Sequence, residues 1–293
     1  MNKTNHIFPK YSKIELSEFL DENKFMDAYV ELLKQTINLL ILITKHRYFD
    51  EVKNQPKSIS KDEAIIGGNL TRLIKLNTSF LENICNGKRE IALIISRCIA
   101  ETAINTQYML IEGEEKVLRN YIKYSLIAEK ELWTKIKDNI VDRKGSIQEI
   151  EKRMLKSIEN SFDSSEFDLE EVKRSSKWKS IAQRAKVVAG EQFYKVFYGI
   201  GSHTVHGNWQ DILVHHLDEG DNNNFKLNLE WNRPRPQLME CAIAFNLILT
   251  KLFVEKEKFK EKSSYLQKVQ ILSEYQIELG EAHENYLTNK TKC

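Results

Sequence analysis

The chain has 293 residues, and its 41% hydrophobic and 29% charged content excludes wholesale disorder and predicts a globular protein. Its 44 basic and 42 acidic residues leave a net charge of +2, which excludes strong attraction to nucleic acid or to an anionic membrane by overall charge. The polar start and the absence of any CxxC pair predict a reduced, cytoplasmic protein. No purely aliphatic run approaches the roughly 20 residues of a membrane span, so no membrane association is expected.

Proline occurs only at positions 9, 56, 234 and 236. The long stretch between residues 57 and 233 therefore has no proline to break a helix. Apolar spacing of three and four predicts helices, and Ser60 with Glu63 forms a predicted capping box at one helix start. The expected helices cover about 17–46, 60–86, 88–112, 114–141 and 146–160. Three of the cysteines fall in these and later apolar patterns and are expected to be buried: Cys85, Cys98 and Cys241.

The second half of the chain changes its periodicity. Residues 162–176 are polar and indicate a loop, and helix is expected again over 178–206 with a break at Gly190. The apolar run 212–217 and the alternating run 225–231 flank a turn-prone segment and predict a β-hairpin, followed by helices over 237–262 and 264–289. We therefore expect a mainly α bundle of eight to ten helices with one small β-hairpin near residues 212–231. It should form one continuous globular unit of three segments: 1–87, 88–233 and 234–293.

Arg97 and Glu101 are the first candidate site residues. They lie four residues apart on an otherwise apolar helix and so share one face. Burying an arginine and a carboxylate costs several kcal/mol per ion, which makes a functional interpretation worth stating. The alternative is a structural ion pair that ties helices together.

The segment from Glu191 to Asp211 holds the densest group of chemically useful side chains. His203 and His206 share a helix face and could act as acid and base, as part of a ligand or nucleic-acid site, or as metal ligands with Glu101. The alternative is a structural role at a helix end, and we assign no metal and no cofactor. His215 and His216 would point to opposite faces of a strand, so at most one could join them. Core packing is expected for two tryptophans, Trp209 and Trp231.

Several enzyme classes lack their motifs here. The chain has no GxxxxGK[ST] phosphate loop, no GxGxxG after a strand, no HExxH and no GxSxG. Gly199 and Gly201 form a GxG inside a helical pattern, which favours close helix packing over nucleotide binding. The sequence therefore does not identify a reaction.

The order of these polar residues resembles a family. Arg97-x-x-x-Glu101, followed by Phe197-Tyr198-x-x-x-Ser202-x-x-x-His206, is similar to the bacterial family catalogued as domain of unknown function 5677 over about residues 88–214. The resemblance implies an all-α bundle without an established activity. Its recurring polar positions match Arg97, Glu101, Tyr198, Ser202 and His206.

A looser likeness is to the HEPN helical superfamily, whose members are often ribonucleases of toxin and antiphage systems. Their signature places an arginine four to six residues before a histidine. Neither His203 nor His206 has an arginine at that distance, which argues against ribonuclease activity of that kind.

The leading expectation is a bacterial nucleotide- or RNA-binding effector of a defence or stress system, with a pocket of Arg97, Glu101, Tyr198, Ser202, His203 and His206. The alternatives are a hydrolase, HEPN-like or metal-dependent, using His203 and His206, and a structural protein that binds a protein partner or forms a homo-oligomer. RNA contact would need a local basic face, because overall charge is too low. The candidates for that face are Lys173, Arg174, Lys177, Lys179, Arg184 and Lys186.

Overall fold

The structure is a computed structural model that describes residues 11–50, 52–53, 55–172, 177–190, 204–221 and 224–290. The chain forms two compact units. One contains residues 1–111 and 184–293, and the other contains residues 112–183. The three segments expected from the sequence, 1–87, 88–233 and 234–293, stay an interpretation of the sequence.

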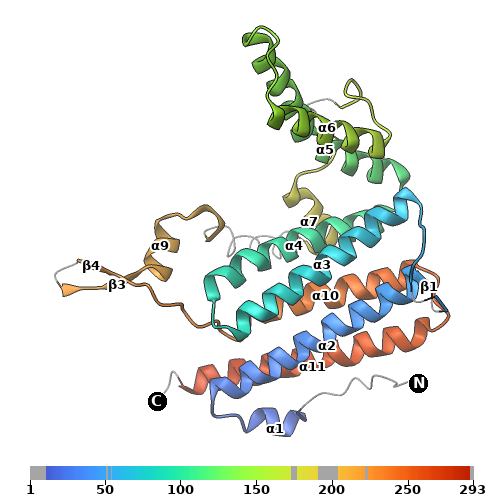
Figure 1. The fold of residues 1–293 in the computed structure, drawn as a ribbon. Coiled ribbons are helices and arrows are strands. Elements are labelled where there is room, and N and C mark those ends of the chain that lie inside the picture. Colours follow the sequence, from blue (N-terminus) through green and yellow to red (C-terminus); the bar gives the residue numbers. More distant parts are fainter. Residues whose placement is uncertain are drawn as a thin grey trace. The chain divides into compact units, whose positions relative to one another are not determined.

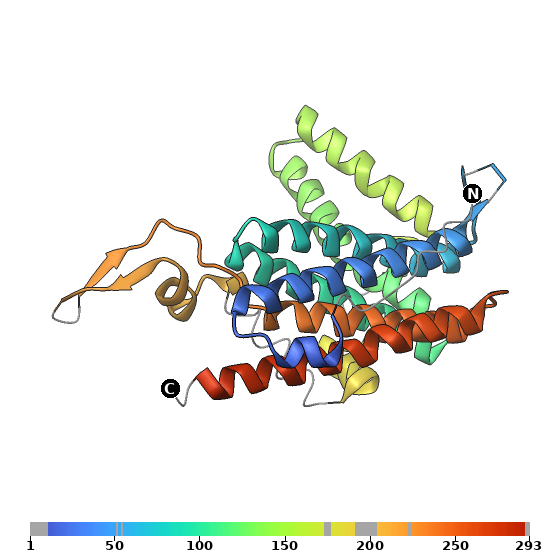
Figure 2. The ribbon, with the colours of Figure 1, turned by 90° about the horizontal axis from the view of Figure 1, so that it is seen from below.

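The larger unit is a helical bundle (Figure 1). Its long helices are α2 (Glu22–Tyr48), α3 (Lys61–Cys85), α4 (Arg89–Glu112), α10 (Gln237–Lys256) and α11 (Lys262–Lys290). Helix α10 packs against both α2 and α11, and α2 also packs against α3 and α11. Helices α2 and α11, far apart in the sequence, run side by side in the second view as well (Figure 2).

Capping residues set several of these helix starts. The predicted capping box of α3 is confirmed, because the Glu63 amide donates to Ser60 Oγ at 3.3 Å and the Ser60 amide donates to Glu63 Oε2 at 3.1 Å. Helix α2 starts at Glu22 because Asp21 caps it, accepting from the Asn23 amide at 3.0 Å. The helix expected from residue 17 thus begins later, at Glu22, and a short helix α1 (Lys13–Ser17) precedes it.

The core of the larger unit lies between α2, α10 and α11. Helix α10 supplies five apolar side chains with no exposed surface: Met239, Ile243, Leu249, Phe253 and Val254. By length and composition alone α10 could cross a membrane, but 56% of its apolar window is buried inside the protein. An apolar helix that contacts two neighbours is the pattern of a core helix.

One polar contact crosses this core. Asn77 on α3 and Asn246 on α10 are both 0% exposed, and each amide group donates to the other's oxygen at 2.9 Å. Asn77 Nδ2 also donates to the Leu73 carbonyl at 2.8 Å. The pair satisfies its own hydrogen bonds, so burial leaves no carboxamide oxygen or nitrogen of the contact without a partner.

The smaller unit is built on α5 (Glu115–Asp142) and α6 (Glu149–Ser165), which pack against each other. Helix α6 is longer than expected, because Phe162 lies in the buried cluster and continues the helical spacing of Leu155 and Ile158. The other members of this cluster are Leu126, Ile136, Phe167 and Val172. The small unit therefore has an apolar core of its own.

The strands are few and short. Strand β1 (Phe49–Asp50) pairs with β2 (Gln55–Pro56), and β3 (Leu217–Glu219) pairs antiparallel with β4 (Phe225–Leu227). The predicted mainly α fold with a small hairpin near 212–231 is confirmed. The hairpin's first strand begins later than expected, because residues 209–215 form helix α9 (Trp209–His215).

The cysteines are only partly as expected. Cys98 and Cys241 are half-buried, and burial raises the pKa of the Cys241 thiol to about 12. Cys85 is exposed, so the expectation of burial was wrong there. It is the last residue of α3 and follows Ile84, the last buried residue of that helix, so it lies beside the face that meets the core.

Candidate functional site

Arg97 and Glu101 form the predicted contact on α4. Arg97 Nε lies 3.2 Å from Glu101 Oε1, with side chains 13% and 41% exposed. The shared helix face is confirmed, but the expectation of a buried carboxylate was wrong, because Glu101 retains much of its contact with solvent. A neighbouring contact joins α3 to this face, since Arg72 Nε donates to Thr102 Oγ1 at 3.2 Å. This hydrogen bond links α4 to α3, whereas the Arg97–Glu101 pair lies within α4.

The structure describes only part of the second half of the predicted site, residues 191–211. His206 lies in the helical turn 204–206 and is exposed, while Thr204 is 8% exposed. Tyr198, Ser202 and His203 fall outside the described residues. The meeting of Arg97 and Glu101 with this segment therefore stays a prediction.

The predicted basic face is not one helix surface. Helix α7 (Ile181–Ala189) starts after Lys179, which lies 3.7 Å from Glu112. Arg184 is 6% exposed and so cannot present its charge to a large ligand, whereas Lys177 and Lys186 are exposed. Lys173 and Arg174 fall outside the described residues. The expectation of a helical face carrying Lys179 was wrong, because the helix begins two residues later.

A different polar group gathers where α4 begins. His216 Nε2 lies 3.3 Å from Glu90 Oε1. Asp211 joins them, and one potential ligand atom from each of the three residues lies within 4.8 Å of the other two. We call this group the Glu90–Asp211–His216 triad.

Helix α9 brings the triad together. Asn208 caps the helix, because its side chain accepts from the Asp211 amide at 3.1 Å. The helix then places Asp211 and His215 one turn apart on a buried face, at 4% and 7% exposure. His216 follows as the C-cap, so a helix rather than a strand sets the directions of both histidines.

Burial lowers the pKa of His215. Asp211 and Glu90 oppose this shift in pKa, whereas Arg89 and His216 add to it. Desolvation therefore favours the neutral form of the His215 imidazole, although both negative and positive charges act on it.

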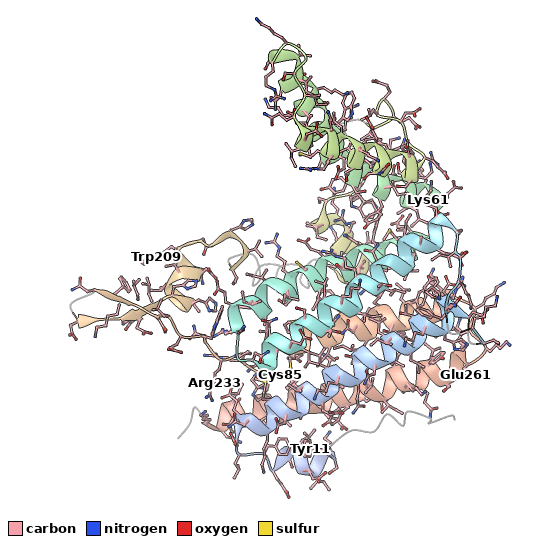
Figure 3. All side chains as sticks on the ribbon, in the orientation of Figure 1. Tyr11, Lys61, Cys85, Trp209, Arg233 and Glu261 are labelled. Carbon is pink, nitrogen blue, oxygen red and sulfur yellow. The ribbon has the colours of Figure 1, made fainter. Side chains whose placement is uncertain are left out.

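Asn232 connects the segments around the triad. Its side chain donates to the Val214 carbonyl at 2.7 Å and lies 3.5 Å from His215 Nδ1. Its own carbonyl accepts from the Arg89 amide at 3.1 Å. One residue therefore joins α9, the start of α4 and the segment after the hairpin. In the view of Figure 3, Arg233 is drawn near Cys85, the last residue of α3.

Four cations lie on these joined segments, and we call them the cationic cluster: Lys88, Arg89, Arg233 and Arg235. Lys88 Nζ lies 5.7 Å from the centre of the Trp231 ring. Burial lowers the pKa of Arg89, and the positive charge of Arg235 lowers it further. None of the four forms an ion pair with a residue in the described part of the chain.

Exposed aromatic rings lie on the same part of the chain. Trp209 is 60% exposed and Trp231 is 50% exposed, so the expectation that both pack in the core was wrong. Trp209 packs edge-on against Phe225, with ring centres 5.6 Å apart. These rings come from α9 and the hairpin segment, where the described neighbours are too few to cover them.

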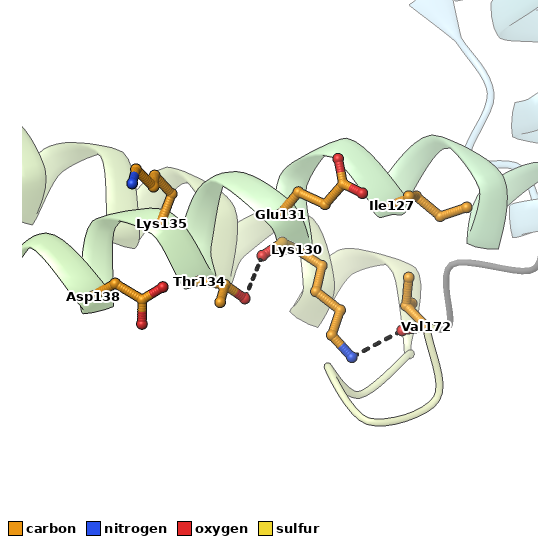
Figure 4. Close-up of a pocket in the computed structure, with 7 residues that line it drawn as sticks. All are labelled: Ile127, Lys130, Glu131, Thr134, Lys135, Asp138 and Val172. Atoms are coloured by element: carbon orange, nitrogen blue, oxygen red, sulfur yellow. Dashed lines mark hydrogen bonds between the residues drawn. The ribbon is translucent and has the colours of Figure 1, made fainter.

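Two hollows on the protein, one in each unit, contain a cation that already contacts other protein groups. In the small unit, a groove of about 610 Å³ runs beside α5 (Figure 4), but Lys130 Nζ is already held by the carbonyls of Leu169 and Val172 at 2.6 and 2.9 Å. In the large unit, a hollow of about 450 Å³ includes Arg47, which is paired with Glu63 and Glu257 at 2.6 and 2.8 Å. Lys130 and Arg47, the cations with printed contacts in these two places, are therefore already held by protein groups.

Sequence reasoning missed Glu90 and gave Asp211 no role of its own. Asp211 lay at the end of the dense segment, and the density was the signal that could have identified it. Glu90 had no signal, because a glutamate in the first turn of a helix is common. Only the fold shows that it meets residues more than a hundred positions later.

Comparison with known proteins gives one match. A model of the family of unknown function DUF5677 matches residues 63–226, more than half of the chain, a range that includes Arg97, Glu101, His206 and the triad. No curated protein and no solved structure matches. The looser likeness to the HEPN superfamily is not shown by these comparisons. The chain belongs to the family of unknown function DUF5677.

Proposed function

We propose that this protein binds a phosphate-bearing ligand, a nucleotide or a short RNA segment, at the cationic cluster. The observation that carries the proposal is the gathering of four cations that have no ion-pair partner among the described residues. The hydrogen bond from the Arg89 amide to the Asn232 carbonyl, 3.1 Å long, holds their two segments together. The positive charges of Arg89 and Arg235 repel each other, so an anion bound beside them would be favourable.

The cation types suit phosphate. An arginine guanidinium presents a planar fork of donors that can hold two phosphate oxygens at once, and lysine adds a mobile point charge. Arg89 is half-buried, so its charge acts where solvent screens it less than at the open surface. Arg235 is exposed and leaves the approach open.

Trp231 could hold a base beside the phosphate. Its half-exposed ring already lies near Lys88 Nζ, and an indole face can stack on any nucleobase. A ligand with both a phosphate and a base would use both features, whereas inorganic phosphate would use only the cations.

The proposal keeps the ligand class expected from the sequence and moves its contacts to a different group of residues. Arg97 is a weaker phosphate contact, because Glu101 already pairs with it. The hydrolase based on His203 and His206 and the structural partner-binding protein stay predictions. The bacterial, cytoplasmic setting and the defence or stress role likewise stay predictions.

The test is RNA affinity as a function of salt, measured by fluorescence anisotropy. The probe is a labelled single-stranded RNA of about 12 nucleotides, a length within the usual site sizes of single-strand binders. Four phosphate contacts would give a log–log slope of about −3, since each contributes roughly −0.7. The double variant Arg89→Gln/Arg235→Gln should lower affinity and flatten the slope by about 1.4.

Arg153→Gln on α6 is the matched control, because Arg153 is exposed and lies in the other unit. It should leave the slope unchanged. Unlabelled ATP should compete with the RNA if a single nucleotide suffices. The proposal fails if RNA and ATP show no binding at low salt, or if the double variant binds as the wild type does while melting normally.

A further inference from the structure

The Glu90–Asp211–His216 triad has the composition of a metal site. It offers two carboxylates and one imidazole from α4 and from the two ends of α9. These are oxygen and nitrogen donors that first-row divalent ions accept, with coordination positions left for other ligands. The triad shares no residue with the cationic cluster, although Glu90 follows Arg89 in the chain and both Arg89 and Asp211 act on the charge of His215.

The distances suit a single ion. Two ligand atoms about 2.1 Å from one ion lie about 3.4 Å apart at a tetrahedral angle. His216 Nε2 and Glu90 Oε1 are 3.3 Å apart, which matches such a pair. No pair of the three ligand atoms is farther apart than 4.8 Å, so a shift that closes a pair by at most about 1.4 Å would complete the site. Glu90 and His216, at 18% and 45% side-chain exposure, have room to make that shift.

Asp211 gives the independent indication of a ligand. Its side chain is 4% exposed, and its Oδ1 atom has no hydrogen-bond partner among the described residues. A buried carboxylate oxygen without a donor is costly, and such atoms are rare in native structures. An ion bound by Asp211 would satisfy it.

A purely structural explanation accounts for only part of the group. A hydrogen bond between His216 and Glu90 would satisfy those two side chains. It would leave Asp211 close to a second carboxylate, and two neighbouring negative charges repel each other. A bound cation turns this repulsion into attraction for all three residues.

We propose that Glu90, Asp211 and His216 bind one divalent transition-metal ion, of the class of Mn²⁺ or Zn²⁺. Carboxylates favour Mn²⁺, and imidazole favours Zn²⁺. The inference does not depend on RNA binding, because the test uses the metal alone and leaves the cationic cluster unchanged. Either proposal can therefore fail without the other.

The experiment is calorimetric titration of chelator-treated protein with Mn²⁺. Mn²⁺ is the first probe because the cysteine thiols of this chain, which prefer softer ions, compete poorly for it. Wild-type protein should bind one ion per chain and melt at a higher temperature with the ion than without it. Asp211→Asn and Glu90→Gln should each weaken binding at least about 10-fold.

Glu219→Gln is the matched control, since Glu219 is an exposed carboxylate on β3 of the same part of the chain. It should bind Mn²⁺ as the wild type does. Asp211→Asn also distinguishes a metal site from a purely structural role of the triad, even when no metal is added. In metal-free protein it should melt no lower than the wild type, because it removes an unpaired charge from beside Glu90.

Two outcomes would overturn the proposal. One is a wild-type protein with neither saturable binding nor a change in melting temperature on adding Mn²⁺ or Zn²⁺. The other is an Asp211→Asn variant that binds the ion as tightly as the wild type. A metal-free Asp211→Asn protein that melts lower, with no effect of metal on either protein, would instead assign Asp211 a structural role.

Discussion

The Asn77–Asn246 contact and the Glu90–Asp211–His216 triad both join polar side chains that are far apart in the sequence. In the first, each amide donates to the other at 2.9 Å, and both residues are fully buried. In the second, Asp211 Oδ1 has no donor among the described residues. Polar groups that satisfy one another specify packing, whereas a group with an unsatisfied atom and further ligand atoms around it indicates a missing partner.

His283 shows why an unsatisfied atom alone is not enough. Its side chain is 1% exposed, and neither ring nitrogen has a hydrogen-bond partner among the described residues. Aromatic rings surround it, with the centre of the Phe25 ring 4.6 Å away. An isolated imidazole between apolar rings is a core residue kept neutral by burial, and it lacks the convergent ligand atoms of the triad.

The largest effect is expected where the satisfied contact is broken. Asn77→Leu leaves Asn246 buried without its partner, and should lower the free energy of unfolding by about 1–3 kcal/mol. Urea denaturation followed by circular dichroism would measure it. Lys75→Leu is the control, because this exposed position on the same helix should change stability by less than about 0.5 kcal/mol.

The double variant Asn77→Leu/Asn246→Leu sharpens the test. Replacing both partners leaves no unpaired amide, so its destabilisation should be smaller than the sum of the two single changes. A strictly additive result would mean that the two amides do not depend on each other. The Asn77–Asn246 contact could then no longer serve, in the comparison with the triad, as the example of polar groups that satisfy each other.

His283 should make the stability of the larger unit depend on pH. Burial lowers its pKa below the ordinary value of 6.5, although Glu22 and Glu284 favour the charged form. The unfolded chain therefore binds the proton more readily than the folded one. Its contribution is fully present above pH 6.5 and is lost as pH falls below 6.5 toward the lowered value.

Melting temperatures from pH 7.5 down to about pH 5 test this prediction. His283→Phe fills the same aromatic surroundings without a titrating group, so its melting temperature should fall less over this range. Equal falls in the two proteins would assign the acid sensitivity to other groups.

Much of the helical fold could be predicted from the sequence, because its causes are local. The Ser60–Glu63 capping box, the proline-free middle and the apolar spacing of α2 and α10 act within a few residues of each helix. The prediction failed where local signals competed. The apolar run from Ile212 favoured a strand, but the Asn208 cap starts a helix that continues to His215.

The candidate site depended on contacts that no local pattern contains. Glu90 and His216 meet only because the fold brings the segment after α9 to the start of α4. The exposure of Trp209 and Trp231 was missed for a related reason, since general burial statistics describe tryptophan and not the number of neighbours at one position. The dense segment Glu191–Asp211 includes one residue of the triad, Asp211, and its role as a site stays a prediction.

The smallest effect on stability is expected at the surface of the cationic cluster. Trp231 is half-exposed, so Trp231→Ala should change the free energy of unfolding by no more than about 0.5 kcal/mol, far less than Asn77→Leu. If its ring stacks on a base, the same change should weaken RNA affinity by roughly 5- to 150-fold, corresponding to about 1–3 kcal/mol per stacked base. Trp209→Ala is the matched control, because Trp209 is also at least half-exposed but already packs against Phe225. Anisotropy measurements at a single low salt concentration would compare the variants. Unchanged affinity in Trp231→Ala, with the Arg89→Gln/Arg235→Gln variant still impaired, would limit the site to phosphate and remove the base from it.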